Sequence, residues 1–282
     1  MLQCAGRSLD LATPAIMGVI NATPDSFSDG GSLFQGSRLD INCAMTRARA
    51  LVEEGAAIID IGGESTRPGA AAVSTGEECE RVLPLVERIC AELDVIVSVD
   101  TSSAQLMSDA AAAGAGMIND VRALTSDGAL AAAAESGLPV CLMHMRGSPA
   151  DMQQSPQYQG VVKSVADYLA ARILDCEAAG ISRGSLILDP GFGFGKTVAH
   201  NLQLLQGLPQ LAKFGLPLMV GLSRKSMIEK LIGRAVDERL PASLALAVLA
   251  VERGAGIIRT HDVAATADAV AMAVALAGVE TQ

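Results

Sequence analysis

One set of side chains in this sequence suits the oxygens of an anionic phosphate group. Arginine can donate two parallel hydrogen bonds to such a group, and asparagine and histidine add further N–H donors. Arg259 and His261 are two residues apart, so in an extended segment both side chains point to the same side. The candidates for a phosphate site are Asn21, Arg67, Arg259 and His261.

A second set suits a flat, neutral heterocycle. A buried carboxylate accepts two parallel hydrogen bonds from an edge with amidine-like N–H groups, and a lysine donates to a ring carbonyl. Each such residue could instead cap a helix, close a turn or face solvent, so the case depends on the fold bringing them together. The candidates are Asp100, Asn119, Asp189 and Lys225.

The elements that must position these residues are short apolar segments, each followed by a polar or glycine-rich loop. Continuous apolar runs of this length are typical of strands buried on both faces of a parallel sheet. Eight such segments begin near Ile16, Ala57, Val95, Gly116, Pro139, Ser185, Pro217 and Gly256.

The intervals between the segments each have room for one helix and two loops. Helices are predicted at 40–54, 75–93, 103–113, 161–179, 200–213 and 263–277. Thr75 and Glu78 have the spacing of a capping box, and Pro84 predicts a kink in that helix. The alternation predicts one (β/α)8 barrel that occupies residues 1–282 as a single domain. A doubly wound open sheet is the alternative.

The carboxyl ends of the strands would rim one face of the barrel, where such folds carry their chemistry. The first apolar run, Ile16 to Ile20, ends at Asn21 and opens into a loop of small and polar residues. The glycine-rich loops 21–36 and 62–76 are long enough to close over a bound ligand and exclude water. A solvated turn is the alternative reading of the first loop.

Composition argues against several classes of protein. The net charge of −10 makes a nucleic-acid or acidic-membrane surface unexpected. The chain lacks an apolar run of the ~18 residues that would indicate a transmembrane helix, and its start lacks signal-peptide features, so we expect a cytoplasmic protein. The six cysteines form no CxxC pair, which indicates reduced thiols rather than disulfides or a metal site.

Two local patterns imitate known motifs. The segment PGFGFGKT has Pro190 where a P-loop needs glycine, and its glycines do not fit G-x-G-x-x-G. Asn21 and Thr23 form a glycosylation triplet, but Pro24 follows and nothing indicates secretion. Neither pattern predicts a function.

Seven segments, in order, closely resemble the dihydropteroate synthases of the folate pathway. They are GVINATPDSFSDGG, IDIGGESTRPGA, SVDT, GMIND, DPGFGFGK, GLSRKS and IIRTHD, within about residues 15–275. The resemblance implies a (β/α)8 barrel, usually a homodimer. It implies an enzyme that uses Mg²⁺ to join 6-hydroxymethyl-7,8-dihydropterin diphosphate to p-aminobenzoate, with release of diphosphate. Residues 1–14 and 146–160 match least.

The resemblance also implies roles for individual residues. The pterin pocket would contain Asp100, Asn119, Asp189 and Lys225. The p-aminobenzoate site would contain Phe27, Thr66, Pro68, Phe194 and Ser223. The diphosphate site would contain Asn21, Thr66, Arg67, Arg259 and His261, with Asn21 also a ligand of Mg²⁺. The catalytic residues would be Asp100, Lys225, Arg67 and Asn21.

These residue types fit such a reaction, whose barrier is the loss of diphosphate from an exocyclic CH₂ group. Positive groups would stabilise the leaving charge, and Asp100 with Asp189 would stabilise cationic character on the ring. One alternative is a pterin-binding barrel that transfers a methyl group from a folate to a corrinoid. Another is a non-catalytic pterin-binding or scaffold protein. The methyltransferase would not need the STRP segment together with Arg259 and His261. A scaffold protein would be expected to have lost some of the diphosphate-binding residues, and none is missing from the sequence.

Overall fold

The computed structural model describes residues 1–23, 34–35, 38–65, 73–147, 152 and 156–279. Four predicted site residues lie outside the described residues. They are Phe27, Thr66, Arg67 and Pro68. The same is true of most of the predicted closing loop 21–36 and of the middle of the loop 62–76.

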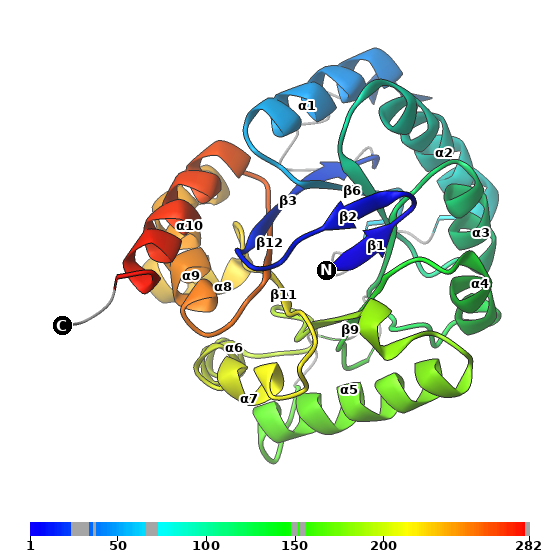
Figure 1. The fold of residues 1–282 in the computed structure, drawn as a ribbon. Coiled ribbons are helices and arrows are strands. Elements are labelled where there is room, and N and C mark those ends of the chain that lie inside the picture. Colours follow the sequence, from blue (N-terminus) through cyan, green and yellow to red (C-terminus); the bar gives the residue numbers. More distant parts are fainter. Residues whose placement is uncertain (24–33, 36–37, 66–72, 148–151, 153–155, 280–282) are drawn as a thin grey trace.

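Eight parallel strands form the centre of the fold, in the order β10-β9-β8-β7-β6-β3-β12-β11. A bridge between Leu188 and Leu218 joins the two ends of this order, so the sheet closes on itself. The predicted barrel is therefore confirmed, and the open doubly wound sheet is wrong (Figure 1). The strands are β3 (Ala15–Asn21), β6 (Ile58–Gly62), β7 (Ile96–Asp100), β8 (Met117–Asp120), β9 (Val140–Met143), β10 (Leu186–Asp189), β11 (Met219–Gly221) and β12 (Ile257–Thr260).

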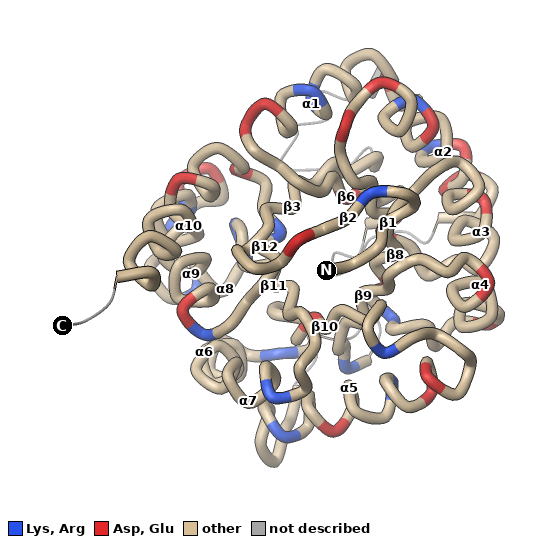
Figure 2. The backbone as a smooth tube through the Cα atoms, in the orientation of Figure 1, with Lys and Arg blue, Asp and Glu red and all other residues tan. Residues whose placement is uncertain are grey.

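Helices form a ring around the barrel, with apolar faces packed on the strands and charged residues spread over the ring (Figure 2). They are α1 (Ile41–Glu53), α2 (Thr75–Glu92), α3 (Ala104–Ala112), α4 (Ala129–Ser136), α5 (Val161–Ala178), α6 (Val198–Gln206), α7 (Leu208–Ala212), α8 (Ser226–Ile232), α9 (Leu240–Val251) and α10 (Val263–Ala277). No described helix has both the length and the apolar character needed to cross a membrane.

Two local predictions about the helices are wrong. The helix predicted at 200–213 is two helices, because Pro209 lacks an N–H and its ring would clash with the carbonyl of a preceding turn. The α2 cap is Ser74, whose Oγ accepts a hydrogen bond from the Glu77 N–H at 3.3 Å, so Thr75 is already helical. Helix α2 continues through Pro84, the residue at which the sequence predicted a kink.

A hairpin closes the amino-terminal end of the barrel. It consists of β1 (Leu2–Cys4) and β2 (Arg7–Leu9), and Figure 1 shows it lying across that end. Leu2, Cys4 and Leu9 form one apolar cluster with inward side chains such as Met17 and Ile58. A second, two-stranded pair is formed by β4 (Phe34–Gln35) and β5 (Arg38–Leu39). The amino-terminal end is thus filled with apolar side chains, whereas β3, β7, β8 and β10 each end in a polar residue.

Candidate active site

A buried carboxylate lies at the centre of the polar cluster, and sequence reasoning missed it. Asp60, in the middle of β6, is fully buried. Its Oδ1 accepts a hydrogen bond from Ser98 Oγ at 2.6 Å. Its Oδ2 accepts from Asn119 Nδ2 at 3.1 Å and from Arg259 Nε at 2.7 Å. The signal was present in the sequence, since an aspartate inside an otherwise apolar buried strand needs partners.

Arg259 joins Asp60 to Asp100. Its Nη2 donates to Asp100 Oδ2 at 3.1 Å, while its Nε is bonded to Asp60. Burial opposes the charge of Arg259, but the two carboxylates more than offset this and raise its pKa. Burial, and then the charge of Asp60, raise the pKa of Asp100 to about 8. Residues predicted for two sites, the pterin pocket and the diphosphate site, thus belong to one ion-pair network.

Asp189 ends β10 and is 6% exposed. Its Oδ1 accepts a hydrogen bond from the Gly191 N–H at 2.7 Å. Burial raises the pKa of this carboxyl, and the Gly191 bond partly counteracts the rise. Gly191 has a φ of +69°, and a Cβ there would lie 1.9 Å from the carbonyl oxygen of His144. Only glycine can therefore make this turn behind the carboxylate.

Lys196 holds the loop that follows Asp189 in place, and no role was predicted for it from the sequence. Its Nζ is buried and donates to the carbonyls of Gly191 at 2.8 Å and Phe194 at 3.1 Å. It also lies 3.0 Å from Nδ1 of His144. Burial lowers the pKa of Lys196 to about 7 and that of His144 to about 3. These bonds fix the loop that carries Phe194.

Lys225 follows β11, the strand that the Leu188–Leu218 bridge places next to β10, which carries Asp189. Its Nζ lies 4.4 Å from the centroid of the Phe194 ring, within the range of a cation–π contact. Burial lowers the pKa of Lys225 to about 8, and the Asp189 carboxylate partly counteracts this. An amine, an aromatic ring and a carboxylate therefore line one part of the mouth.

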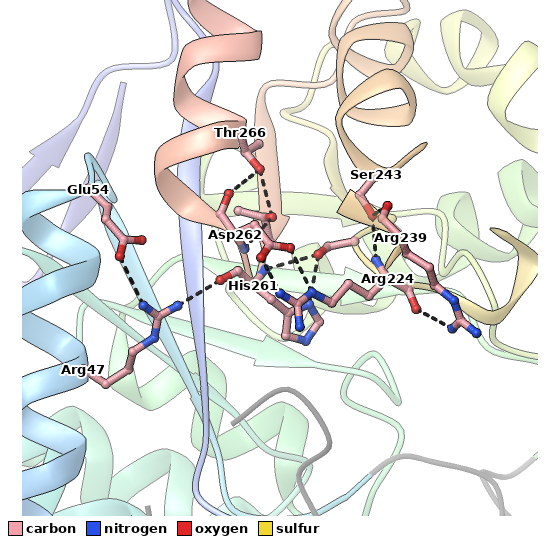
Figure 3. Close-up of polar contacts among 10 residues, drawn as sticks. Arg47, Glu54, Arg224, Arg239, Ser243, His261, Asp262 and Thr266 are labelled. Carbon is pink, nitrogen blue, oxygen red and sulfur yellow. Dashed lines mark hydrogen bonds and ion pairs between the residues drawn. The ribbon is translucent and has the colours of Figure 1, made fainter. Parts of the chain in front are cut away.

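His261 is held between the loops that follow β11 and β12. Its Nδ1 lies 3.0 Å from Ser223 Oγ, and the same Oγ accepts the His261 backbone N–H at 3.3 Å. Arg47 donates to the His261 carbonyl at 2.9 Å (Figure 3). Burial, then the charges of Arg259 and Arg224, lower the pKa of His261 to about 3. The ring is thus neutral near pH 7. Since Ser223 Oγ already accepts the His261 backbone N–H, its own hydrogen can be donated to Nδ1, and in that tautomer the ring proton is on Nε2.

Asn21 is the last residue of β3 and pairs in register with Gly62 of β6. A carboxamide oxygen is a suitable ligand for Mg²⁺, which prefers hard oxygen donors. Among the described residues, no group of three or more His, Cys, Asp or Glu side chains could hold a metal ion. Mg²⁺ commonly takes one or two ligands from a protein and the rest from substrate phosphate oxygens and water, so the Asn21 carboxamide is of a type that could serve as one of them.

The comparisons with known proteins agree with this geometry. A family model described as pterin binding enzyme matches residues 17–261, which include every predicted site residue. The dihydropteroate synthase of Escherichia coli (strain K12) is 53% identical over 264 residues, which are 94% of this chain and 92% of the relative.

The chain belongs to the dihydropteroate synthase family.

Solved structures of this family have the same barrel. The Yersinia pestis dihydropteroate synthase with a sulfonamide drug complex has a TM-score of 0.95 and 49% identity, covering 99% of both chains. The Xanthomonas albilineans dihydropteroate synthase in complex with 7,8-dihydropteroate has a TM-score of 0.88 and 46% identity, again covering 99% of both chains. These relatives favour the synthase over the corrinoid methyltransferase and the non-catalytic scaffold.

Proposed function

We propose that this chain joins 6-hydroxymethyl-7,8-dihydropterin diphosphate to p-aminobenzoate and releases diphosphate. The enzyme is a transferase: the C–O bond to diphosphate breaks, a C–N bond to the arylamine forms, and the amine loses a proton. The observation that supports this most is the barrel mouth, where the charges of Asp189 and Lys225, on neighbouring strands, interact, and where Asp60, Arg259 and Asp100 form a network. This arrangement offers carboxylates to a heterocycle and N–H donors to a leaving anion.

In this proposal the dihydropterin lies between Asp189 and Asn119. The Asp189 carboxylate accepts two hydrogen bonds from the amino-amidine edge, and Lys225 donates to the ring carbonyl. The ionised form of Asp100 would stabilise the positive charge that develops on the ring, because a nearby cation favours the charged form of a carboxyl. Arg259 already holds Asp100 in place through Nη2.

The leaving diphosphate would lie above Asn21 and His261, with Thr66 and Arg67 as further donors. His261 donates through Nε2–H as a neutral group, and Arg259 can donate through Nη1, which neither of its two ion-pair bonds uses. Mg²⁺, held in part by Asn21, supplies neutralisation of the leaving charge when it is bound. Asn21 and Arg67 thus act as catalytic residues together with Asp100 and Lys225.

The p-aminobenzoate would bind against Phe194 and Ser223, with Phe27, Thr66 and Pro68 completing the site. The arylamine is a weak nucleophile, so its position over the exocyclic carbon matters more than a strong base. A sulfonamide that mimics p-aminobenzoate is expected to compete for this site, which makes the enzyme a sulfonamide target.

A diphosphate-release assay tests the proposed function. Release is expected only when the pterin diphosphate and p-aminobenzoate are both present, with one dihydropteroate formed for each diphosphate. Removal of divalent cations with a chelator is expected to abolish release, and Mg²⁺ is expected to restore it. Release that proceeds equally without p-aminobenzoate would contradict the proposal.

The order of substrate binding gives a second test. We expect p-aminobenzoate to bind weakly to the free protein and at least about tenfold more tightly after Mg²⁺ and diphosphate, because diphosphate would engage Asn21 and Arg67 beside the p-aminobenzoate site and so couple the two sites. Titration calorimetry with and without Mg²⁺-diphosphate measures this. Phe27→Ala should raise the KM for p-aminobenzoate and leave pterin binding unchanged. Equal affinity in both states would contradict the coupling.

We propose a homodimer formed by the face that α9 and α10 share. These helices pack together and expose large apolar side chains, among them Leu249, Met272 and Leu276, and exposed apolar patches mark interaction sites. Light scattering should give twice the chain mass of 28.9 kDa. Met272→Lys with Leu276→Lys should give a monomer, whereas Leu174→Lys, at an exposed leucine on α5, should not. A dimer that survives both α10 changes would exclude this face.

We also propose a cytoplasmic location. All six cysteines are free, including the exposed Cys43, which suits a reducing compartment.

A further inference from the structure

Arg224 has a backbone conformation that a residue with a side chain rarely adopts. Its φ is +55°, in the left-handed region. It stands between Ser223 and Lys225, two residues to which the proposed function gives roles. A non-glycine residue keeps such a conformation only where its surroundings hold it.

Three residues hold Arg224 from two other elements (Figure 3). Its backbone N–H donates to Ser243 Oγ at 3.0 Å, and its carbonyl accepts from Arg239 Nη1 at 3.0 Å. Ser243 lies on α9, Arg239 immediately precedes that helix, and both are buried. The Arg224 guanidinium binds the Asp262 carboxylate through two bonds, of which Nε to Oδ2 is 2.9 Å.

Asp262 is itself fixed at the start of α10. Its backbone N–H donates to Thr260 Oγ1 at 3.2 Å, and its carbonyl accepts from Thr266 Oγ1 at 2.6 Å. These two bonds hold the backbone of Asp262, and with it the carboxylate, at the start of α10. The ion pair ties the loop after β11 to the loop after β12.

The ion pair between Arg224 and Asp262 also affects the side-chain directions of Ser223 and Lys225, the two residues next to Arg224 in the chain. Ser223 Oγ meets His261, the residue before Asp262, at 3.0 Å. Lys225 Nζ meets the Phe194 ring at 4.4 Å. Because Arg224 lies between them in the left-handed conformation, a change at this one residue would turn both side chains away from their partners.

We propose that Asp262 is a positioning residue for the synthase reaction, holding Arg224 so that Ser223 and Lys225 face the p-aminobenzoate and pterin sites. Ser243 and Arg239 act with it by fixing the Arg224 backbone. The inference rests on the proposed function, because the two positioned residues take their roles from it.

Asp262→Asn tests this with little change in shape. The KM for p-aminobenzoate is expected to rise about tenfold and kcat to fall by about the same factor, because both positioned groups shift. Asp175→Asn is the matched control, since it removes another arginine–aspartate ion pair (Arg172 Nη1 to Asp175 Oδ2, 2.6 Å) on the outer helix α5. It should leave both constants unchanged. An Asp262→Asn enzyme that loses kcat in proportion to its unfolded fraction, with KM unchanged, would overturn the proposal.

A charge reversal provides the rescue. Arg224→Asp keeps a residue type that tolerates the left-handed conformation but places two carboxylates together. Combining it with Asp262→Arg restores an ion pair across the two loops. The double variant should recover at least about tenfold of the kcat/KM that Arg224→Asp loses. A double variant no better than either single change would overturn the proposal.

One readout needs no substrate. In ¹⁵N NMR spectra, Asp262→Asn should shift the His261 Nδ1 signal, because Ser223 Oγ moves away, and Asp175→Asn should not. An unchanged His261 signal in Asp262→Asn would overturn the positioning role. Failure of the wild-type diphosphate-release assay would instead overturn the proposed function, so the two failures are distinguishable.

Discussion

Asp189→Asn is expected to lower the affinity for a dihydropterin by roughly 10²–10⁴-fold while the barrel stays folded. The estimate assumes that two charge-assisted hydrogen bonds, each of about 1.5–3 kcal/mol, lose their charge and that one of them is replaced by an NH₂ group facing a pterin N–H. Calorimetric titration with a pterin measures the affinity, and thermal unfolding checks the fold. Near wild-type affinity in this variant would show that Asp189 does not hold the pterin.

Asparagine is a better replacement than alanine at this position. Asp189 Oδ1 also accepts the Gly191 N–H at 2.7 Å, and an asparagine oxygen can keep that bond. Asp189→Ala would leave a buried N–H without its partner, so it should lose stability as well as affinity. Asp167→Asn, an exposed aspartate on α5, is the matched control and should change neither.

Arg259→Met is expected to lower the free energy of unfolding by about 3–5 kcal/mol at pH 8, because it leaves the buried Asp60 and the partly buried Asp100 carboxylates without their cation. Asp60 and Asp100 lose their bonds to Nε and Nη2 at the same time. Urea unfolding measures the loss. Arg183→Met, at an arginine with 45% of its side chain exposed, should change stability by less than about 0.5 kcal/mol.

The effect of Arg259→Met should depend on pH with a definite sign. The pKa of Asp100 is about 8 in the folded state against 3.8 as a free group, so between these values the folded state holds a proton that the unfolded state has lost. This group therefore favours folding at low pH, and the benefit is lost as pH rises from 3.8 to about 8. Removal of Arg259 raises the pKa of Asp100 in the folded state further. The part of the deficit due to Asp100 should therefore be small near pH 5 and largest above pH 8, in addition to the part due to Asp60.

Two comparisons separate the roles of Arg259. Adding Asp60→Asn to Arg259→Met should recover part of the lost stability, since it removes one of the unpaired charges. His261 forms none of the ion pairs of this network. His261→Ala should therefore weaken the binding of diphosphate by one to two decades, without a similar loss of affinity for a pterin that lacks diphosphate. A deficit in Arg259→Met that stays constant from pH 5 to pH 9 would contradict the electrostatic explanation.

The sequence by itself determined the barrel and the end of it that carries the chemistry. A strand buried on both faces must be continuously apolar, and this signal is local, so all eight strands were predictable. Parallel strands place their carboxyl ends on one face, so Asp100, Asn119 and Asp189 could be expected to gather there. The assigned roles of these residues came from the resemblance to a family.

Only the tertiary structure decided which of these side chains bind one another. Asp60 and Arg259 are 199 positions apart, and nothing local to either predicts their 2.7 Å bond. Nothing local predicts the ion pair between Asp262 and Arg224 either. The left-handed backbone of Arg224 is held by contacts with Ser243 on α9 and with Asp262 at the start of α10. The partners of a side chain depend on barrel closure and on the direction each residue takes inside it. Propensity and periodicity report on neither, because both are properties of one segment of chain.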